Sequence, residues 1–525
     1  MKEKVKVLYN SFSETVLLRL LASWCFTAFL FTLYTAGGYT ELENFKKIGL
    51  VLTVGITGFA FLFFSVLKVA FGKKKTDRVS LLFFFGLYSL FCAFTADNWY
   101  TVFVFGALWT ILCFYYAESG YIQEKPGFKK RRPRFFILLA AAVFVLFVGG
   151  TGMLRYYTFS APNYDFGIFC QMYHNMRAHF SPVTTCERDT LLSHFAVHLS
   201  PIFYTLLPVY ALFPSGATLQ LCQGLLLASG VFPVYLIAKK YGLSERRAVL
   251  WSVVFSLSPV LACGTNYDFH ENCFLVPLLL WMFYFFEKEK YIPFGIFAAL
   301  TLLVKEDAAV YVAMFALYMI LDRKKRLSGA ITGICALGYF VFAVWLLSTS
   351  GNGVMTGRYS NYIIQDGGFA ELIKNVLADP AFVFTQLFLD KTGDYTEKLL
   401  FILQMTVPLA FLPFTAKRPS RLILLLPMVL FNLMTLYPYQ YQVGYQYAFG
   451  SFTFLFYLSI INLSEKKETT VTALTRAAAI ITALCFVYTA VPRNLHYLSL
   501  YVEEPEKYAA MEEKLSEIPP QKSVV

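Results

Sequence analysis

The stretch IPFGIFAALTLLVKEDAAVYVAMFALYMIL, residues 292–321, decides the fold class of this chain. Two apolar runs, each long enough for a helix, are separated only by the charged triplet Lys305-Glu306-Asp307. Charges between membrane-spanning runs are expensive, and where they occur they usually face a cavity and indicate function. The simpler alternative is an outer hairpin between two short spans, with Lys305 paired locally. Both interpretations predict helices that meet at a membrane surface.

The composition extends this interpretation to the whole chain. Of the 525 residues, 57% are hydrophobic and only 15% are charged, whereas soluble domains carry about 25% charged residues. Apolar runs of roughly 20 residues, enough to cross a bilayer, recur along the sequence. We therefore expect an all-α integral membrane protein whose main partner is the lipid bilayer. The net charge of +12 lies mostly in short loops, which indicates topology rather than nucleic-acid binding.

Basic loops set the predicted topology, because cytoplasmic loops are enriched in Lys and Arg. The clusters that we place inside are Lys73–Lys75 with Arg78, Lys129–Arg134, Lys239/Lys240 with Arg246/Arg247, Arg323–Arg326, Lys417/Arg418/Arg421 and Lys466/Lys467. Between them we expect about fifteen transmembrane helices. These are 16–38, 48–71, 79–96, 101–117, 135–154, 216–238, 248–263, 273–286, 292–304, 308–321, 327–349, 396–416, 422–437, 447–463 and 471–491.

The assignment of the basic clusters to the inside leaves no crossing for Pro201–Phe213, which is also too short to span. We therefore expect a re-entrant or interfacial segment there. The segments that then lie outside are 155–200, 264–272, 305–307, 350–395, 438–446 and the tail after Pro492. This predicts a multi-pass protein of the inner (cytoplasmic) membrane, with its N-terminus inside and its C-terminus outside. We expect three parts: a four-helix addition at 1–120, a transmembrane core at 135–492, and an outer tail at 493–525 that could be truncated.

All six histidines fall on the predicted outer side, together with several acids. The long first outer loop, 155–200, carries Asp165 between aromatic residues, followed by His194 and His198. An aspartate in a low-dielectric cleft at the membrane surface can acquire a pKa that suits a general base. Alternatively, Asp165 caps a helix that begins near Gly167, since aspartate is a favoured N-cap. The two roles are compatible.

A second acidic group, Asp268, His270 and Glu271, lies in the short loop 264–272. The alternative is a solvated hairpin, although such a turn rarely needs these residues interleaved with Tyr and Phe. The group could also bind a divalent cation, but its spacing is not diagnostic of a metal site. We therefore assign no metal ligands and no certain cofactor. In the Lys305–Asp307 triplet, the lysine could neutralise a phosphate as a point charge.

Arg358 and Tyr359, in the second long outer loop, offer another phosphate clamp, unless Arg358 is simply a surface arginine. The aromatic run Tyr437–Tyr447 fits an interfacial belt. It would also serve to stack on a sugar or prenyl chain. Cys170 and Cys186 share the first outer loop, and the sequence does not decide whether they pair.

Six motifs recur in a recognisable order: NYDFGIF at 163–169, SHF at 193–195, ALFPS at 211–215, PVYLIAK at 233–239, YDFHE at 267–271 and VKEDA at 304–308. In this order they resemble the domain of unknown function 2079 family of polytopic prokaryotic membrane proteins. The resemblance runs from about residue 135 to the C-terminus and leaves the spans before residue 120 uncovered. That family is in turn similar to the GT-C superfamily of glycosyltransferases.

The resemblance implies a GT-C-like core, a sugar donor carried on polyprenyl phosphate, and Asp165 as catalytic base or acceptor-binding group with Asp268 as its partner. From the residues themselves we add Glu306 as a third catalytic candidate. The candidate substrate-binding residues are His194, His198, His270, Glu271, Lys305, Asp307, Arg358 and Tyr359. One departure matters, because Gln446-Tyr447 stands where a His-Tyr pair is expected in the last outer loop. The role of that histidine is vacant or reassigned here.

These expectations favour a membrane glycosyltransferase of the hexosyltransferase class. It would move a sugar from a polyprenyl-phosphate donor to an unknown acceptor at the outer face of the cytoplasmic membrane. The alternative is a lipid or small-solute transporter or flippase that uses the outer acids as ion or proton sites. A transporter usually places ionisable groups near the midplane and often contains a repeated half, and the sequence indicates neither. A scaffold without catalysis would not need the Lys305–Asp307 triplet.

The topology leads to a first prediction. In intact cells, a single cysteine that replaces His179 in the outer segment 155–200 should react with a membrane-impermeant maleimide, whereas one that replaces Arg131 should not, because the two positions are assigned to opposite sides. The opposite labelling pattern would contradict the topology. Permeabilised cells, in which both cysteines should react, provide the control.

Overall fold

The computed structural model describes residues 2–38, 42–71, 75–121, 132–161, 163–188, 190–353, 356–363 and 368–519. Within them the chain is almost entirely helical, and its one sheet is a two-stranded antiparallel ribbon of β1 (Val183–Thr184) and β2 (Leu192–Ser193). Helices satisfy all their backbone hydrogen bonds internally, which is what a lipid environment demands. The basic clusters near residues 73 and 130 and the residues 520–525 fall wholly or partly outside the described residues.

The chain divides into two compact units, Met1–Trp109 and Thr110–Val525. The first contains α1 (Lys2–Tyr34), α2 (Leu42–Ile48), α3 (Leu50–Phe71), α4 (Thr76–Phe94) and the start of α5 (Trp99–Glu118). An ion-pair cluster joins its three long helices: Asp77 of α4 accepts hydrogen bonds from Arg19 of α1 at 3.0 and 3.1 Å and from Lys68 of α3 at 2.7 Å. Removing a charge from such a cluster would leave its partner buried without compensation.

Ten helical segments of the described chain are long and apolar enough to cross a membrane. They are Thr15–Tyr34, Leu50–Ala70, Thr76–Phe94, Trp99–Glu118, Pro133–Tyr157, Gly216–Lys240, Glu245–Tyr267, Arg326–Ser350, Gln446–Ser464 and Glu468–Glu503. Each matches a span expected from the sequence. The expected number of about fifteen is not confirmed, because the remaining expected spans form shorter or interrupted helices.

Proline explains where two of the expected spans are interrupted. The helix α20 (Thr396–Thr406) ends just before Pro408, and Ala410 and Phe411 then take positive φ values of 50° and 54°. The expected span 422–437 is a 3-10 helix (Pro419–Leu425), a short α21 (Leu426–Met428) that contains Pro427, and a π-helix (Val429–Leu433). Proline lacks the amide hydrogen and restricts the residue before it. By contrast, α23 (Glu468–Glu503) continues through Pro492, so the last span extends beyond its expected end at 491.

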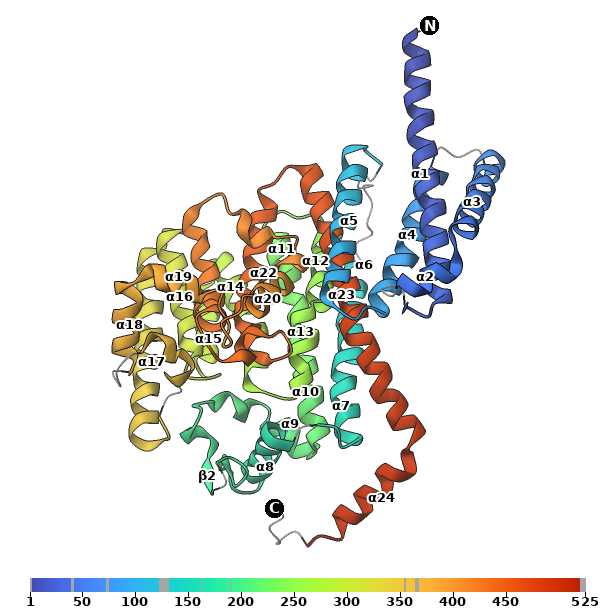
Figure 1. Cartoon of the computed structure of the whole chain (residues 1–525). Helices are drawn as coiled ribbons and strands as arrows, with labels where there is room; N and C mark the ends of the chain where they lie inside the picture. Colours follow the sequence, from blue (N-terminus) through green and yellow to red (C-terminus); the bar gives the residue numbers. More distant parts are fainter. Residues whose placement is uncertain are drawn as a thin grey trace. The chain divides into compact units, whose positions relative to one another are not determined.

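The second unit is built around helices whose faces are largely buried, with α22 (Phe449–Ser464) at its centre (Figure 1). Other helices of this unit are α6 (Arg132–Phe144), α7 (Gly150–Tyr157), α8 (Asn163–His179), α9 (Leu207–Leu212), α10 (Gly216–Ser229), α11 (Val231–Lys240), α12 (Glu245–Ser256), α13 (Pro259–Gly264), α14 (Leu275–Glu287), α15 (Tyr291–Leu302), α16 (Ala308–Leu321) and α17 (Arg326–Ser350). Later in the chain come α18 (Gly368–Ala378), α19 (Pro380–Gln386) and α24 (Pro505–Ser516).

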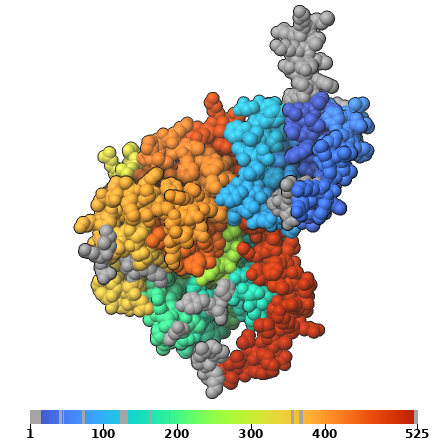
Figure 2. Space-filling model, in the orientation of Figure 1, coloured from blue at the N-terminus to red at the C-terminus, as the bar shows by residue number. Residues whose placement is uncertain are grey.

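One end of the second unit carries α8, α9 and the β-ribbon (Figure 1). Residues 201–213 form a 3-10 helix (Pro201–Thr205) and the six-residue α9, which are too short to span a membrane. The two long loops meet here, because the Asn352 amide donates to the Ala196 carbonyl at 2.8 Å, and the segments near residues 200 and 350 adjoin on the visible surface (Figure 2). A side chain at Gly351 would collide with that carbonyl, so glycine permits the approach. We call this the α8 end.

The other end of α14 is held by a buried carboxylate. Glu287 accepts hydrogen bonds from the hydroxyls of Tyr241 at 2.8 Å and Tyr457 at 2.5 Å, and its second oxygen accepts from Arg323 at 3.1 Å. Both carboxylate oxygens are therefore satisfied, as a buried ion pair requires. These contacts tie α11, α14 and α22 to the turn after α16. They hold the bundle together far along α14 from the cavities described below.

Candidate functional site

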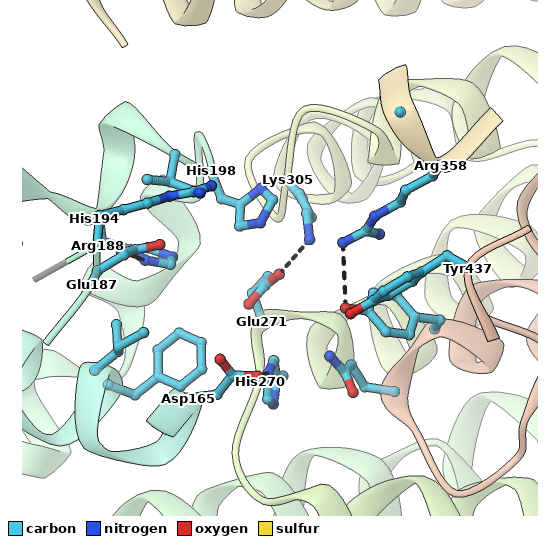
Figure 3. A pocket seen from close by; sticks show the side chains of 16 residues that line it. Asp165, Glu187, Arg188, His194, His198, His270, Glu271, Lys305, Arg358 and Tyr437 are labelled. Carbon is cyan, nitrogen blue, oxygen red and sulfur yellow. Dashed lines mark hydrogen bonds and ion pairs between the residues drawn. The ribbon is translucent and has the colours of Figure 1, made fainter. Parts of the chain in front are cut away.

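A cavity of about 470 Å³ lies at the α8 end, within the range of about 300–1,000 Å³ that is typical of small-molecule sites (Figure 3). Six stretches of the chain form its wall: the start of α8, the loop of the β-ribbon with the residues that follow it, the loop before α14, the α15–α16 turn, the loop near residue 357 and the loop 437–447. The lining residues are Asp165, Ile168, Phe169, Glu187, Arg188, His194, Val197, His198, His270, Glu271, Lys305, Gly357, Arg358, Tyr437, Gln446 and Tyr447. We call it the polar cavity.

Asp165 lies in the first turn of α8 and faces the polar cavity. The helix begins at Asn163 rather than near Gly167, so the expected N-cap role of Asp165 is wrong: the residue is already helical. Its Oδ2 lies 3.4 Å from Nε2 of His270, and its side chain is 29% exposed. Burial acts to raise the pKa of Asp165, but the hydrogen bond and charge of His270 outweigh it and hold that pKa below its ordinary value. A carboxylate is therefore available at neutral pH.

Asp268, expected as the catalytic partner of Asp165, is instead sealed inside the bundle with no exposed surface. It pairs with Arg155 at 2.9 and 3.3 Å and accepts a hydrogen bond from Gln220 at 2.6 Å. Burial raises its pKa to about 6, and Arg155 opposes the shift. Asp268 lines neither cavity described here. Direct contact with a substrate in these cavities is therefore not supported by its position.

The buried pair holds the loop that carries two cavity residues. Asp268 has a φ of 80°, which residues other than glycine seldom adopt. Gln223 clamps both sides of the turn, because it donates to the Asp268 carbonyl at 2.9 Å and accepts from the His270 amide at 3.1 Å. Phe269 is buried, and the side chains of His270 and Glu271 after it point into the polar cavity (Figure 3). Asp268 is a positioning residue in this arrangement.

Lys305 forms a buried ion pair with Glu271 at 3.0 Å. Burial acts against both charges, yet Glu271 raises the pKa of Lys305 and Lys305, aided by neighbouring histidines, lowers that of Glu271. Both side chains therefore carry charge. Only one oxygen of Glu271 is used, because Oε2 has no hydrogen-bond partner among the described residues. The alternative in which Lys305 pairs locally is not what the structure shows, because its partner Glu271 belongs to the distant loop before α14.

Two histidines of the first long loop are each oriented by a glutamate. Nδ1 of His194 lies 2.8 Å from Glu187, and Nδ1 of His198 lies 2.9 Å from Glu306. Glu306 also accepts from the Leu199 amide at 3.1 Å. Burial and the nearby Lys305 hold the pKa of His198 well below its usual value, so its ring is neutral. Glu187 was not predicted, although a carboxylate seven residues before His194 in the same loop was a usable signal.

Arg358 lies between two tyrosines of the aromatic run. Its guanidinium carbon is 4.6 Å from the ring centre of Tyr437 and 5.0 Å from that of Tyr447. Cation–π contacts of this kind orient an arginine without neutralising its charge. Arg358 is therefore a cation built into the wall of the cavity rather than an unconstrained surface arginine. The same contacts show that part of the aromatic run has a role at the site and is not only an interfacial belt.

A second cavity of about 470 Å³ adjoins the first, and we call it the apolar cavity. Its wall contains Val310, Met314, Phe340, Leu372, Ile373, Leu430, Phe431 and Met434. His198, Lys305 and Arg358 line both cavities. Glu306, Asp307, Tyr359 and Gln440 complete the lining. Two cations, Lys305 and Arg358, therefore lie where the polar cavity meets the apolar cavity.

The structure brings most of the predicted site residues together, but in two groups. Asp165, His194, His198, His270, Glu271, Lys305 and Arg358 line the polar cavity. Glu306, Asp307 and Tyr359 line the apolar cavity. Sequence reasoning missed Arg188. It considered the run Tyr437–Tyr447 as an interfacial belt or a stacking surface, and Gln446 as a departure from an expected histidine, without placing these residues in the site. The sequence feature that these residues share is their position in loops next to spans, on the same predicted side of the membrane.

No group of three or more His, Cys, Asp or Glu residues in the described chain is arranged to hold a metal ion. All ten cysteines are free, including Cys170 and Cys186 of the first long loop. The pairing that the sequence left open is therefore absent from this structure.

Comparisons with known proteins assign a family but no activity. The family model described as "Predicted membrane protein (DUF2079)" matches residues 155–525. No curated protein and no solved structure matches the chain. The match covers the whole of the polar and apolar cavities.

The position of Asp268 leads to a second prediction. Asp268→Asn should lower the melting temperature markedly, because the buried Arg155 would lose its counter-charge, a loss on the order of 3–5 kcal/mol. Asparagine keeps the size of the side chain and tolerates a positive φ, so the substitution tests the charge. Thermal melting of the detergent-purified chain measures the effect. The matched control is Asp165→Asn at a partly exposed position, which should melt close to the parent. Equal melting of both variants and the parent would contradict the anchoring role.

Proposed function

The chain belongs to the DUF2079 family of predicted membrane proteins, and on that premise we propose that it is a membrane glycosyltransferase. It transfers a sugar from a polyprenyl-phosphate carrier to an acceptor hydroxyl at the outer face of the cytoplasmic membrane. Its donor is half lipid and half sugar, joined by an anionic phosphate. Such a molecule needs an apolar space, a polar space and cations between them.

The observation that carries this proposal is the pair of adjoining cavities that share Lys305 and Arg358. The apolar cavity would hold the first isoprene units, and the polar cavity would hold the sugar. Lys305 is kept protonated by its carboxylate neighbours, chiefly Glu271, and Arg358 remains charged between its two tyrosines. Cations fixed in a low-dielectric site bind a phosphate more strongly than they would in water.

The proposed reaction is a displacement at the anomeric carbon of the donor sugar. The acceptor oxygen forms a bond to that carbon while the bond from the carbon to the phosphate oxygen breaks. The acceptor proton passes to the Asp165 carboxylate, and the electron pair of the broken bond leaves on the polyprenyl phosphate. Lys305 and Arg358 stabilise that departing negative charge. His270 holds Asp165 in position, at a contact of 3.4 Å.

The transport alternative shares part of this evidence, because a lipid flippase would also need an apolar space beside phosphate-binding cations. In a transporter the carboxylate next to the polar space would serve as an ion or proton site rather than as a general base. The two functions differ in product, since transport leaves the donor intact and transfer yields free polyprenyl phosphate. An assay that separates the intact carrier from the free one therefore discriminates between them.

A third prediction tests the catalytic role of Asp165. Asp165→Asn should reduce glycosyl transfer by about 10²–10⁴-fold, the usual contribution of a general base, because an amide cannot take the acceptor proton. Transfer is measured on membranes supplied with polyprenyl-phosphate sugars.

Expression and melting of the Asn variant are measured alongside, and both should match the parent. A variant that melts normally and transfers sugar at the parent rate would remove Asp165 from the chemistry. Glu187→Gln supplies a matched carboxylate-to-amide control in the same cavity, and it should retain more activity than Asp165→Asn because Glu187 acts through His194.

A fourth prediction concerns pH. Burial raises the pKa of Asp307 to about 6, against the opposing charge of Lys305. Below that pH Asp307 is neutral, and above it Asp307 adds a negative charge beside the proposed phosphate site. The affinity for the sugar-bearing carrier, whose phosphodiester keeps a single charge throughout, should therefore fall severalfold as the pH rises from about 5 to about 8. Burial also raises the pKa of Glu306 in this cavity, so it contributes in the same direction.

Asp307→Asn isolates the contribution of that residue. The variant should bind more tightly than the parent at the upper pH and equally at the lower pH, as measured by titration with a fluorescent analogue of the sugar-bearing carrier. Burial holds the pKa of His198 well below its ordinary value, so its ring is neutral at the upper pH. Identical pH curves for parent and variant would show that Asp307 does not face the bound phosphate.

A further inference from the structure

Three buried side-chain atoms on the wall of the polar cavity have no hydrogen-bond partner among the described residues. They are Nε2 of His194, Oε2 of Glu271 and Oε1 of Gln446. The three residues are only 3%, 2% and 2% exposed. An unpaired buried polar atom is destabilising by roughly 1–3 kcal/mol. Three such atoms around one cavity indicate that a ligand supplies the missing hydrogen bonds.

Two of the three atoms, Oε2 of Glu271 and Oε1 of Gln446, are hydrogen-bond acceptors. Nδ1 of His194 faces the Glu187 carboxylate, which can only accept, so Nδ1 carries a proton and Nε2 is the ring nitrogen left for a ligand. Glu271 is ionised beside Lys305, which uses its other oxygen. The Gln446 atom is an amide carbonyl oxygen. The complementary ligand surface therefore carries hydroxyl or amide hydrogens.

The charges around this part of the cavity narrow the ligand further. Three acids, Asp165, Glu187 and Glu271, line it, and the pKa values of Asp165 and Glu271 are held below their ordinary range. Apart from Lys305 and Arg358, the one cation among the described residues of this wall is Arg188, so the acids are in excess here. A second anionic group, such as the carboxylate of a uronic acid, would be repelled here. The phosphate belongs instead beside Lys305 and Arg358, where the two cavities meet. The part of the ligand that lies between these acids and the phosphate is thus neutral and rich in hydroxyls.

We propose that His194, Glu271 and Gln446 form the sugar-binding face of the donor site and make the protein specific for a neutral sugar with free hydroxyls. Gln446 is the specificity-determining member of the three. Its amide offers a carbonyl acceptor at every pH, which an imidazole at the same position would not. This inference rests on the proposed function and adds the class of sugar and the residues that recognise it.

The test measures binding rather than turnover. The purified full-length chain is titrated with three probes of equal charge: polyprenyl phosphate capped as its methyl diester (the bare carrier), the same carrier bearing a neutral hexose, and the carrier bearing the matching deoxyhexose. The hexose-bearing carrier should bind at least about tenfold more tightly than the bare one, because net hydrogen bonds contribute about 0.5–1.5 kcal/mol each. At least one deoxyhexose should lose severalfold of that gain.

The variant Gln446→Leu should lose severalfold of the preference for the hexose-bearing carrier and keep the affinity for the bare carrier. The matched control is Gln442→Leu, in the same loop but outside both cavity linings, which should change neither affinity. The comparison of hexose with deoxyhexose uses only the parent protein, so it remains decisive if the Gln446 variant fails to fold.

Equal affinity of the parent for the bare and hexose-bearing carriers would overturn the sugar-binding face while leaving the lipid-phosphate site standing. An unchanged hexose preference in Gln446→Leu would overturn the role of Gln446. Failure of the parent to bind any of the three carriers would instead overturn the proposed function itself, and this inference with it.

Discussion

A charge inside an apolar helical bundle must be neutralised by a partner, and the Arg155–Asp268 pair is where this constraint shapes the site. The pair is fully enclosed, and Gln220 and Gln223 satisfy the remaining polar atoms around it. It holds the loop before α14 in an unusual backbone conformation from which His270 and Glu271 enter the polar cavity. Glu271 in turn fixes Lys305. Neutralising the buried charge of Asp268 thus also fixes the positions of His270, Glu271 and Lys305.

Much of the fold was predictable because membrane spans leave a strong compositional signal. Long apolar runs identified every one of the ten long helices, and Pro201–Phe213 was recognised as too short to cross. The shorter helices were harder to delimit. Pro408 and Pro427 interrupt runs whose hydropathy alone predicts continuous helices, and Pro492 leaves its helix intact. Hydropathy does not distinguish these outcomes, since packing around each proline decides them.

The residue types of the site were predictable, but the sequence did not show which of these residues line a cavity and which form buried pairs. Acids and histidines at the predicted outer side mark the α8 end, where Asp165, His270, Glu271 and Lys305 meet. Sequence spacing could not show that Asp268 faces Arg155, a residue more than a hundred positions earlier in the chain, rather than the cavity. Nor could it show that the triplet at 305–307 separates two cavities. Such long-range pairings depend on how helix ends converge.

The most direct test of the account is a density map of the full chain bound to a polyprenyl-phosphate sugar. The account predicts that the phosphate lies between Lys305 and Arg358. The first isoprene units should then occupy the apolar cavity beside Val310 and Met314, with the sugar turned towards Asp165 and Gln446. A carrier bound elsewhere on the chain, or with its phosphate away from both cations, would contradict the central claim.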